Sequence, residues 1–144
     1  MTISQILKQK GSHVTSIEPT ATIAELAHTL NEKRIGAVLV IDTAGQLLGI
    51  VSERDVVRCL SQHGAKVLQM TAAQLMTSDL QTATTRMTVD EALGMMTDGR
   101  FRHIPVVEEG KLIGLVSIGD VVKAKISAQA QDVDSLRAYV AGAA

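Results

Sequence analysis

Two short segments of the sequence place a serine and an aspartate three residues apart, each directly after an apolar run. They are Gly49-Ile50-Val51-Ser52-Glu53-Arg54-Asp55 and Gly114-Leu115-Val116-Ser117-Ile118-Gly119-Asp120. An ionised carboxylate can accept charge-assisted hydrogen bonds from two donor groups at once. A helix that begins at the serine would present free N–H groups and partial positive charge to an anion. The same spacing also forms a helix capping box that needs no ligand. The two interpretations are compatible, because the serine can cap the helix while the aspartate still faces a ligand.

Other reactive side chains do not form a catalytic or metal-binding set. Cys59 and His63 have a spacing that can hold a metal, but two ligands do not make a site. Ser52, Asp55 and His63 could be drawn as a hydrolytic set, yet this serine and aspartate would share one helical turn, without the Ser–His–Asp arrangement. The sequence contains neither G-x-x-x-x-G-K-[ST] nor G-x-G-x-x-G. We therefore expect a binding module that is not an enzyme, with no catalytic cofactor and no metal.

The two segments belong to an internal duplication. Residues 45–58 and 110–123 are identical at 8 of 14 positions. A unit of this size cannot easily bury its own core, so we expect two copies to stack about a pseudo-twofold axis. The fold class is α/β (α+β), with tandem β-α-β-β-α repeats at residues 14–64 and 79–126.

The elements of each copy follow from local patterns. A short β-like run precedes a helix with a Thr-x-x-Glu capping box, at Thr22/Glu25 and again at Thr88/Glu91. Two apolar strands and a second helix, opened by the serine, complete the copy. The expected runs and strands are 14–17, 36–41 and 47–51 in the first copy, and 80–84, 101–107 and 112–116 in the second. Pro105 demotes its strand to an edge, which we expect to leave backbone groups open.

Three further segments flank or join the copies. Residues 1–13 are a short amphipathic N-terminal segment. Residues 65–78 are a linker, in which 66–76 is predicted to be helical with Val67, Leu68, Ala72 and Leu75 turned inward. Residues 127–144 form a helical tail with an apolar stripe at Val133, Leu136 and Val140, beside Tyr139. We expect this tail to pack on the module or on a second copy of the chain, as in a homodimer.

Composition limits the class of partner. The formal net charge is −1, and the chain has no long basic run, which argues against nucleic acid. No segment approaches the roughly 18 apolar residues of a membrane span. The single cysteine fits a reducing compartment, so we expect a cytoplasmic protein. Phe101 and Tyr139 are the only aromatic residues, so a flat ligand would be held mainly by aliphatic side chains and backbone groups.

The order of elements, their duplication and the two G-h-h-S-x-x-D junctions (h, apolar) resemble the cystathionine-β-synthase (CBS) domain family. The likeness covers most of the chain. It implies a paired module (a Bateman module) that binds adenosine-containing ligands, namely AMP, ADP, ATP, S-adenosylmethionine or NAD(H), in clefts between the repeats. It also implies a regulatory, energy-sensing role towards an attached or partner protein that the sequence does not identify.

The resemblance assigns roles to individual residues. Asp55 and Asp120 would hold ribose hydroxyls, and Ser52 and Ser117 would face the phosphate. Arg54 and Gly119, at the same position within the two junctions, would also contact the phosphate. Arg102 and His103 would add cationic groups for the phosphate near the second junction. The adenine slot would be formed by Ser16, Ile17, Glu18, Thr82, Ala83, Thr84, Ile104 and Pro105.

A different class of protein remains open. The alternative is a dimerisation or scaffold protein whose clefts hold no ligand.

The copies differ in their charged residues, so the two sites should not be equivalent. The sequence does not reveal the nucleotide, the number of occupied sites or the dimer geometry.

Overall fold

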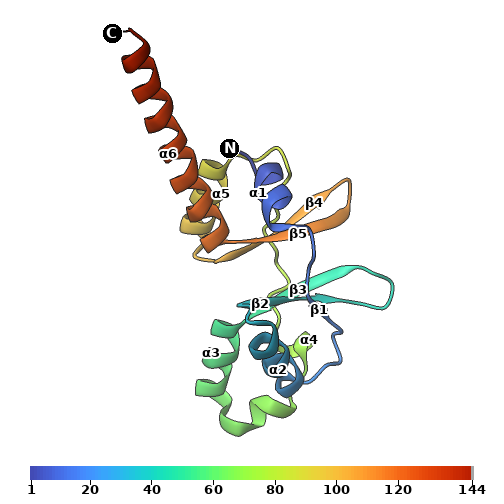
Figure 1. The fold of residues 1–144 in the computed structure, drawn as a ribbon. Coiled ribbons are helices and arrows are strands. Elements are labelled where there is room, and N and C mark those ends of the chain that lie inside the picture. Colours follow the sequence, from blue (N-terminus) through green and yellow to red (C-terminus); the bar gives the residue numbers. More distant parts are fainter. Residues whose placement is uncertain (144) are drawn as a thin grey trace. The chain divides into compact units, whose positions relative to one another are not determined.

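The computed structural model describes residues 1–143, so the last residue of the expected tail lies outside the described part. The chain divides into two compact units, which are coloured along the sequence in Figure 1. The repeat-1 unit contains residues 14–80. The repeat-2 unit contains residues 1–13 together with the chain from residue 81 onward. Strands and helices are mixed in both units, which confirms the α+β class.

The repeat-1 unit follows the predicted β-α-β-β-α order. Its elements are β1 (Ser16–Ile17), α2 (Ile23–Lys33), β2 (Ala37–Ile41), β3 (Leu47–Ser52) and α3 (Glu53–His63). Strand β2 is central, parallel to β1 and antiparallel to β3. Ile23, Leu26 and Leu30 of α2 are buried against the apolar strands, as the i, i+3, i+7 stripe predicts.

The repeat-2 unit repeats this order with one difference in its sheet. Its elements are α5 (Val89–Gly99), β4 (His103–Glu108), β5 (Lys111–Ser117) and α6 (Ile118–Ala143). In place of a strand like β1 there is a single bridge between Ala83 and Val106. The register makes Pro105 the counterpart of Leu39, whose N–H bonds the Thr15 carbonyl at 3.1 Å. Because proline has no N–H, this bond is lost and the parallel pairing shrinks to one bridge.

The backbone around Pro105 is nevertheless not open, and that expectation is wrong. The Ala83 N–H donates to the Pro105 carbonyl at 2.9 Å, and the Val107 N–H donates to the Ala83 carbonyl at 2.9 Å. Strand β4 therefore lies between β5 and the chain at Ala83. Proline removed a donor here without exposing the edge.

The predicted linker helix is also wrong in detail. Residues 64–75 form a 3₁₀ helix η1 (Gly64–Gln69) and a separate turn of helix α4 (Ala72–Leu75). Met70 and Thr71 are extended between them, because Thr71 starts a new helix with a capping box to Gln74. Val67, Ala72 and Leu75 are buried as expected, but Leu68 is exposed.

The N-terminal helix α1 (Ile3–Lys10) packs into the repeat-2 unit, where Ile3 and Ile6 join the core. Helix α4, which precedes repeat 2 in sequence, packs into the repeat-1 unit in the same way. The two helices share a Thr-x-x-Gln cap. Thr2 forms an isolated antiparallel β-bridge with Thr88, and Thr71 forms the same kind of bridge with Thr22. Each body is thus completed by the helix that precedes the other repeat in sequence.

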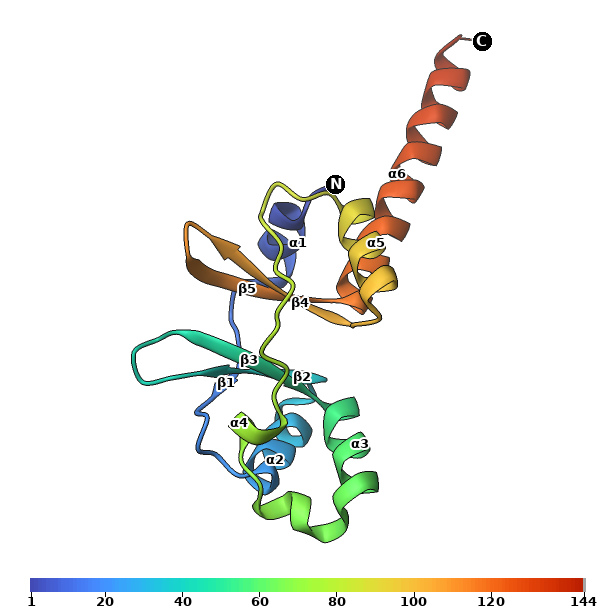
Figure 2. The same cartoon turned by 180° about the vertical axis from the view of Figure 1, so that it is seen from behind.

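Helix α6 differs from its counterpart α3 in length. It contains 26 residues, or about 39 Å at 1.5 Å per residue. Val121 and Ala124 pack into the core, and Lys125 contacts Asp90 of α5 at 2.6 Å. Both views show the remainder extending beyond α5 and the β4–β5 hairpin (Figures 1 and 2). No helix within residues 1–143 is both long and apolar enough to cross a membrane.

Candidate ligand-binding junctions

Both Ser-x-x-Asp segments lie where a strand passes directly into a helix. We call Ser52–Asp55 the first junction and Ser117–Asp120 the second junction. In the first, the Asp55 N–H donates to Ser52 Oγ at 3.2 Å, and the Ser52 N–H returns a bond to Asp55 Oδ2 at 2.8 Å. In the second, the matching distances are 3.1 and 2.9 Å. The capping-box interpretation is therefore confirmed at both junctions.

At the first junction, the cation that pairs with the aspartate comes from the same helix. Asp55 is 9% exposed, and it is the one charged residue in the buried class among the described residues. The Ser52 hydroxyl also donates to Oδ2, at 3.0 Å, and Arg58 Nη2 donates to Oδ1 at 2.9 Å. Arg58 lies one turn further along α3, and its side chain is 59% exposed. Both carboxylate oxygens of Asp55 are thus engaged by residues three positions away, Ser52 and Arg58.

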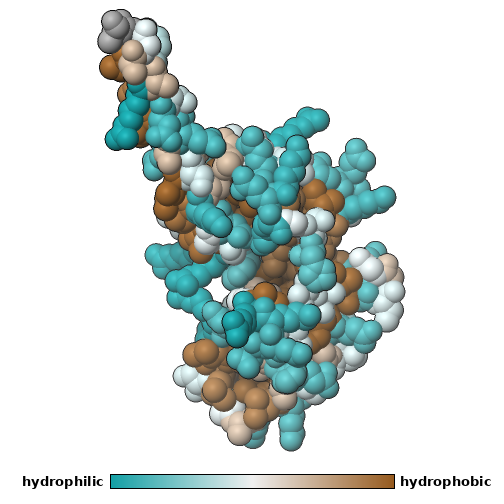
Figure 3. All heavy atoms as spheres, in the orientation of Figure 1, coloured by the Kyte–Doolittle hydropathy of each residue, from teal (hydrophilic) through white to brown (hydrophobic). Residues whose placement is uncertain are grey.

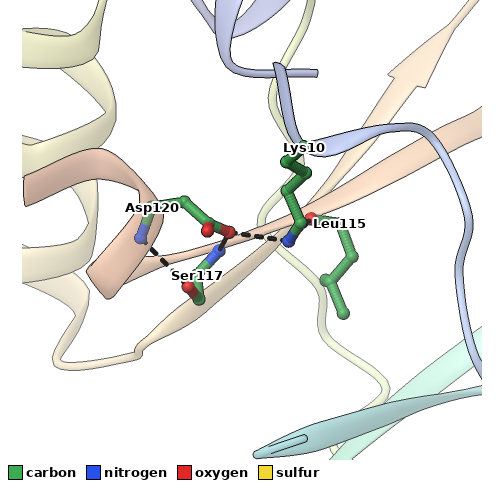
Figure 4. A network of polar contacts seen from close by, with 4 residues as sticks. All are labelled: Lys10, Leu115, Ser117 and Asp120. Carbon is green, nitrogen blue, oxygen red and sulfur yellow. Dashed lines mark hydrogen bonds and ion pairs between the residues drawn. The ribbon is translucent and has the colours of Figure 1, made fainter. Parts of the chain in front are cut away.

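At the second junction, the cation that pairs with the aspartate comes from the N-terminal helix. Lys10, the last residue of α1, places Nζ 2.6 Å from Asp120 Oδ2 and 2.8 Å from the Leu115 carbonyl (Figure 4). Burial raises the pKa of Asp120, but the bonds from Lys10 and the Ser117 N–H outweigh it, so the net pKa lies below the usual value. The carboxylate is therefore held ionised next to a cation.

The residues proposed for phosphate gather at these helix starts. Arg54 and Gly119 are exposed in the first turns of α3 and α6. A side chain at Gly119 would meet only Ser117 Oγ, at 3.6 Å, so this surface is open. Glu53, Arg54, Val57 and Arg58 line a shallow hollow on α3.

Strand β4 and the residue before it bring His103 and Arg102 to the second junction. His103 is paired with Ser117 across the β4–β5 ladder. The carbonyl of Arg102 accepts the Ile118 N–H at 2.8 Å, where α6 begins. The structure therefore brings Arg102 and His103 close to Ser117, as their place in the sequence suggested. The first junction has Gly36 and Ala37 at the equivalent places.

The residues expected to form the adenine slot divide by burial. Ser16, Glu18, Thr82 and Thr84 are exposed on the runs that pair with the central strands, and Ile17 is partly buried. Ala83, Ile104 and Pro105 are buried. Ala83 and Ile104 belong to the core of the repeat-2 unit, so their side chains are not available to line a slot.

Lys10 was not predicted from the sequence as a residue of the site. It belongs to a segment assigned to no repeat, and it lies 110 residues from Asp120. One signal was present in the sequence. The Thr-x-x-Gln-h-h pattern of residues 2–7 recurs at 71–76, which marks α1 and α4 as equivalent lead-in helices.

Comparison with known proteins agrees with the duplicated fold. The family model described as "CBS domain" matches residues 4–62 and 72–127. A mitochondrial CBS domain-containing protein of Arabidopsis thaliana is 33% identical over 149 residues, which cover 98% of this chain and 72% of that protein.

Solved structures give the same result. A CBS-domain containing protein of Agrobacterium tumefaciens is 42% identical with a TM-score of 0.85, covering 87% of this chain and 99% of that one. A putative signal-transduction protein with CBS domains from Burkholderia ambifaria is 36% identical with a TM-score of 0.81, covering 88% and 95%. A CBS domain pair solved with 5′-methylthioadenosine and S-adenosyl-L-methionine has a TM-score of 0.76; it is 23% identical and covers 86% and 98%.

The fold and its two capped junctions thus define a tandem α+β module. The chain belongs to the CBS domain family and carries two copies of the domain, as the sequence pattern predicted. Paired CBS domains are regulatory modules.

Proposed function

We propose that this chain is a regulatory module that binds an adenosine-containing ligand at one or both junctions, where Asp55 and Asp120 hold the ribose. The observation that carries the proposal is that each junction fixes an ionisable carboxylate at a helix start and pairs it with a cation less than 3 Å away. AMP, ADP, ATP, S-adenosylmethionine and NAD(H) are the candidate ligands, and binding requires no turnover. We place its action in the cytoplasm, on a protein partner that remains to be identified.

The carboxylate and its cation can divide the ligand between them. A carboxylate has about four acceptor positions, so its bonds to the cap leave capacity for a ribose hydroxyl. Arg58 and Lys10 have side chains that are 59% and 35% exposed, so each can turn from the carboxylate towards a phosphate. The free N–H groups of the helix start add to the attraction for the phosphate.

The two junctions offer different surroundings for the phosphate. The second adds Lys10, Arg102 and His103, and the first adds Arg54 and Arg58. A related fold has been solved with two adenosyl ligands, which supports this class of ligand. The alternative is a scaffold whose junctions act only as helix caps, and the geometry of both caps is compatible with it.

A thermal-shift panel of AMP, ADP, ATP, NAD, NADH and S-adenosylmethionine separates the two functions. A ligand that binds only the folded state raises its stability by RT ln(1 + [L]/Kd). We expect at least one member of the panel to raise the melting temperature. If none does at saturating concentration, the scaffold alternative holds. Product analysis of the same mixtures tests for turnover, which would make the protein an enzyme.

The ribose assignment is tested by calorimetry on Asp55→Ala and Asp120→Ala. Loss of a hydrogen bond to a charged group costs about 1.5–3 kcal/mol, or roughly 10- to 150-fold in affinity. Asp134→Ala is a matched control, because Asp134 is exposed and lies 14 residues, or about 21 Å, further along α6 than Asp120. Unchanged affinity in both junction variants would remove the ribose assignment while leaving the ligand class in place.

A further inference from the structure

Helix α6 leaves an apolar stripe uncovered along the part that extends beyond its unit. Five apolar residues of this stripe are 40–63% exposed, and Figure 3 shows hydrophobic surface along this helix. Every residue from 129 to 142 is exposed. The family model ends at residue 127, so most of this segment lies outside the CBS pattern.

The stripe has the spacing of a coiled-coil seam. Its members alternate four and three residues apart, which is the repeat of a and d positions in a heptad. They are Val122, Ile126, Gln129, Val133, Leu136 and Val140. The a positions are therefore Ile126, Val133 and Val140, all β-branched, and the d positions are Val122, Gln129 and Leu136. β-Branched residues at a, together with leucine at d as at Leu136, favour two parallel strands.

Charges beside the seam select the orientation of a second copy. Asp132 is at g and Arg137 at the following e, the two positions that meet between chains in a parallel, in-register pair. Neither residue has an ion pair within residues 1–143 of the structure. A second copy would supply Arg137 to Asp132 and Asp132 to Arg137, so both charges on each chain would be matched.

The antiparallel arrangement would oppose like charges. When two antiparallel stripes are aligned so that Val122 of one lies against Val140 of the other, g positions face g positions and e positions face e positions. Asp132 would then meet Asp132 of the second copy, and Arg137 would meet Lys123, which is also at e. Gln129 would lie against Val133, which buries an amide without a partner. In the parallel register Gln129 meets its own copy, and the two amides can hydrogen-bond. One polar layer of this kind fixes register at some cost in stability.

We propose that α6 pairs with α6 of a second copy as a parallel, in-register, two-stranded coiled coil over residues 122–140. This interaction surface is independent of nucleotide binding. It gives the expected homodimer a defined contact and orientation, with the two chains running side by side from the second junction outward.

Disulfide cross-linking in a Cys59→Ser background tests the register. Gln129→Cys places two thiols opposite each other at d, within the Cα separation of about 4.4–6.8 Å that a disulfide needs. We expect mild oxidation of the full chain to give a covalent dimer. Gln131→Cys is the matched control, because position f faces away from the seam, and we expect it to stay monomeric on a denaturing gel.

Two further variants test the seam and the charges. Val133→Asp with Leu136→Asp should abolish both the cross-link at residue 129 and the dimer seen by light scattering. Gln131→Asp with Ala138→Asp adds the same charge on the outer face and should keep both. Arg137→Asp and Asp132→Arg should each weaken the dimer alone, and mixing the two should restore it as a heterodimer.

Three results would overturn the proposal. The first is a monomeric wild-type chain. The second is a dimer in which Gln129→Cys cross-links no better than Gln131→Cys. The third is cross-linking only when Gln129→Cys is mixed with Val133→Cys, which would indicate the antiparallel pair. Because the seam is exposed, the urea midpoint of the Val133/Leu136 variant should match its control at concentrations where both are monomeric, which shows that the units remain folded.

Discussion

The first and second junctions share one backbone design but obtain their neutralising cation from different places. At the first, Arg58 reaches Asp55 from the next turn of the same helix. At the second, Lys10 reaches Asp120 from a helix at the start of the chain. The carbonyl two residues before each serine also accepts its hydrogen bond from a different donor at each junction. Ile50 accepts the Thr77 N–H at 2.9 Å, whereas Leu115 accepts Lys10 Nζ at 2.8 Å.

The duplicated sequence therefore does not make two equal sites. The first junction needs α3 and the backbone after α4, both within residues 14–80. The second is complete only when α1 has docked and brought Lys10. We therefore expect the second junction to respond to changes in the N-terminal segment, and the first to be indifferent to them.

The largest effect should come from a methyl group at the glycine that leads into each junction. A Cβ at Gly49 would lie 2.7 Å from the Thr77 carbonyl oxygen, which is backbone. At Gly114 it would lie 2.7 Å from a terminal carbon of Leu7, a flexible side chain. We expect Gly49→Ala to cost about 1–3 kcal/mol in urea unfolding and Gly114→Ala distinctly less.

A double mutant tests whether the contact with Leu7 is the cause of the Gly114→Ala destabilisation. Combining Gly114→Ala with Leu7→Ala should cost less than the sum of the two single changes, because the clash is removed. Equal destabilisation by Gly49→Ala and Gly114→Ala would contradict the distinction between a backbone and a side-chain neighbour.

Removing the long-range cation should destabilise the repeat-2 unit. Lys10→Met keeps the aliphatic stem but loses the ion pair and the bond to the Leu115 carbonyl. Since both partners are partly exposed, we expect a loss of about 1 kcal/mol. Lys8→Met is the matched control, an exposed lysine on the same helix. Equal values for the two variants in urea unfolding would show that the Lys10 contacts contribute nothing.

The pH dependence of stability should identify Asp120 as an ionised partner. Its pKa is lowered in the folded state, so its contribution is present above the unfolded value, near 3.8, and is lost as pH falls through the lowered value. Asp120→Asn should therefore be less stable than wild type at neutral pH, and the gap should close in acid below pH 3.8. A gap that does not change with pH would mean that the charge is irrelevant.

The smallest effect should come from the local cation. Arg58 is mostly exposed and pairs with Asp55 at i, i+3, where such pairs contribute about 0.2–0.5 kcal/mol. Arg58→Met should therefore lower stability by a few tenths of a kcal/mol in urea unfolding, less than Lys10→Met does. A larger loss than that of Lys10→Met would reverse the ranking of the two cations.

Local patterns were enough to predict the repeats and their caps. Thr22 and Thr88 accept the Glu25 and Glu91 N–H groups at 3.2 and 3.1 Å, which confirms the helix starts. The structure shows no return bond from either threonine N–H to its glutamate carboxylate, and at the second cap the Thr88 hydroxyl donates to Glu91 Oε1 at 3.0 Å instead. Turn chemistry and apolar periodicity act over a few residues, so a single sequence reveals them.

The rest depends on contacts between distant segments. Lys10 and Asp120 are joined only after α1 has packed on β5 and α6. The repeated Thr-x-x-Gln pattern marks α1 as a lead-in helix, but it does not indicate that these two residues meet. Pro105 was correctly recognised as a missing donor, but the chain at Ala83 that covers it belongs to another segment. Leu68 was placed inward by α-helical periodicity, but residues 64–69 form a 3₁₀ helix with three residues per turn, in which Val67 is buried and Leu68 is exposed.

The exchanged lead-in helices decide how the chain can be dissected. A fragment cut at the repeat boundaries, such as residues 14–64, would lack α4 and would expose the core face that Ala72 and Leu75 cover. The natural excisable piece is 14–80. The complementary body is discontinuous, so expressing it alone requires a permuted chain in which residues 1–13 are rejoined to residue 81 through a new connection.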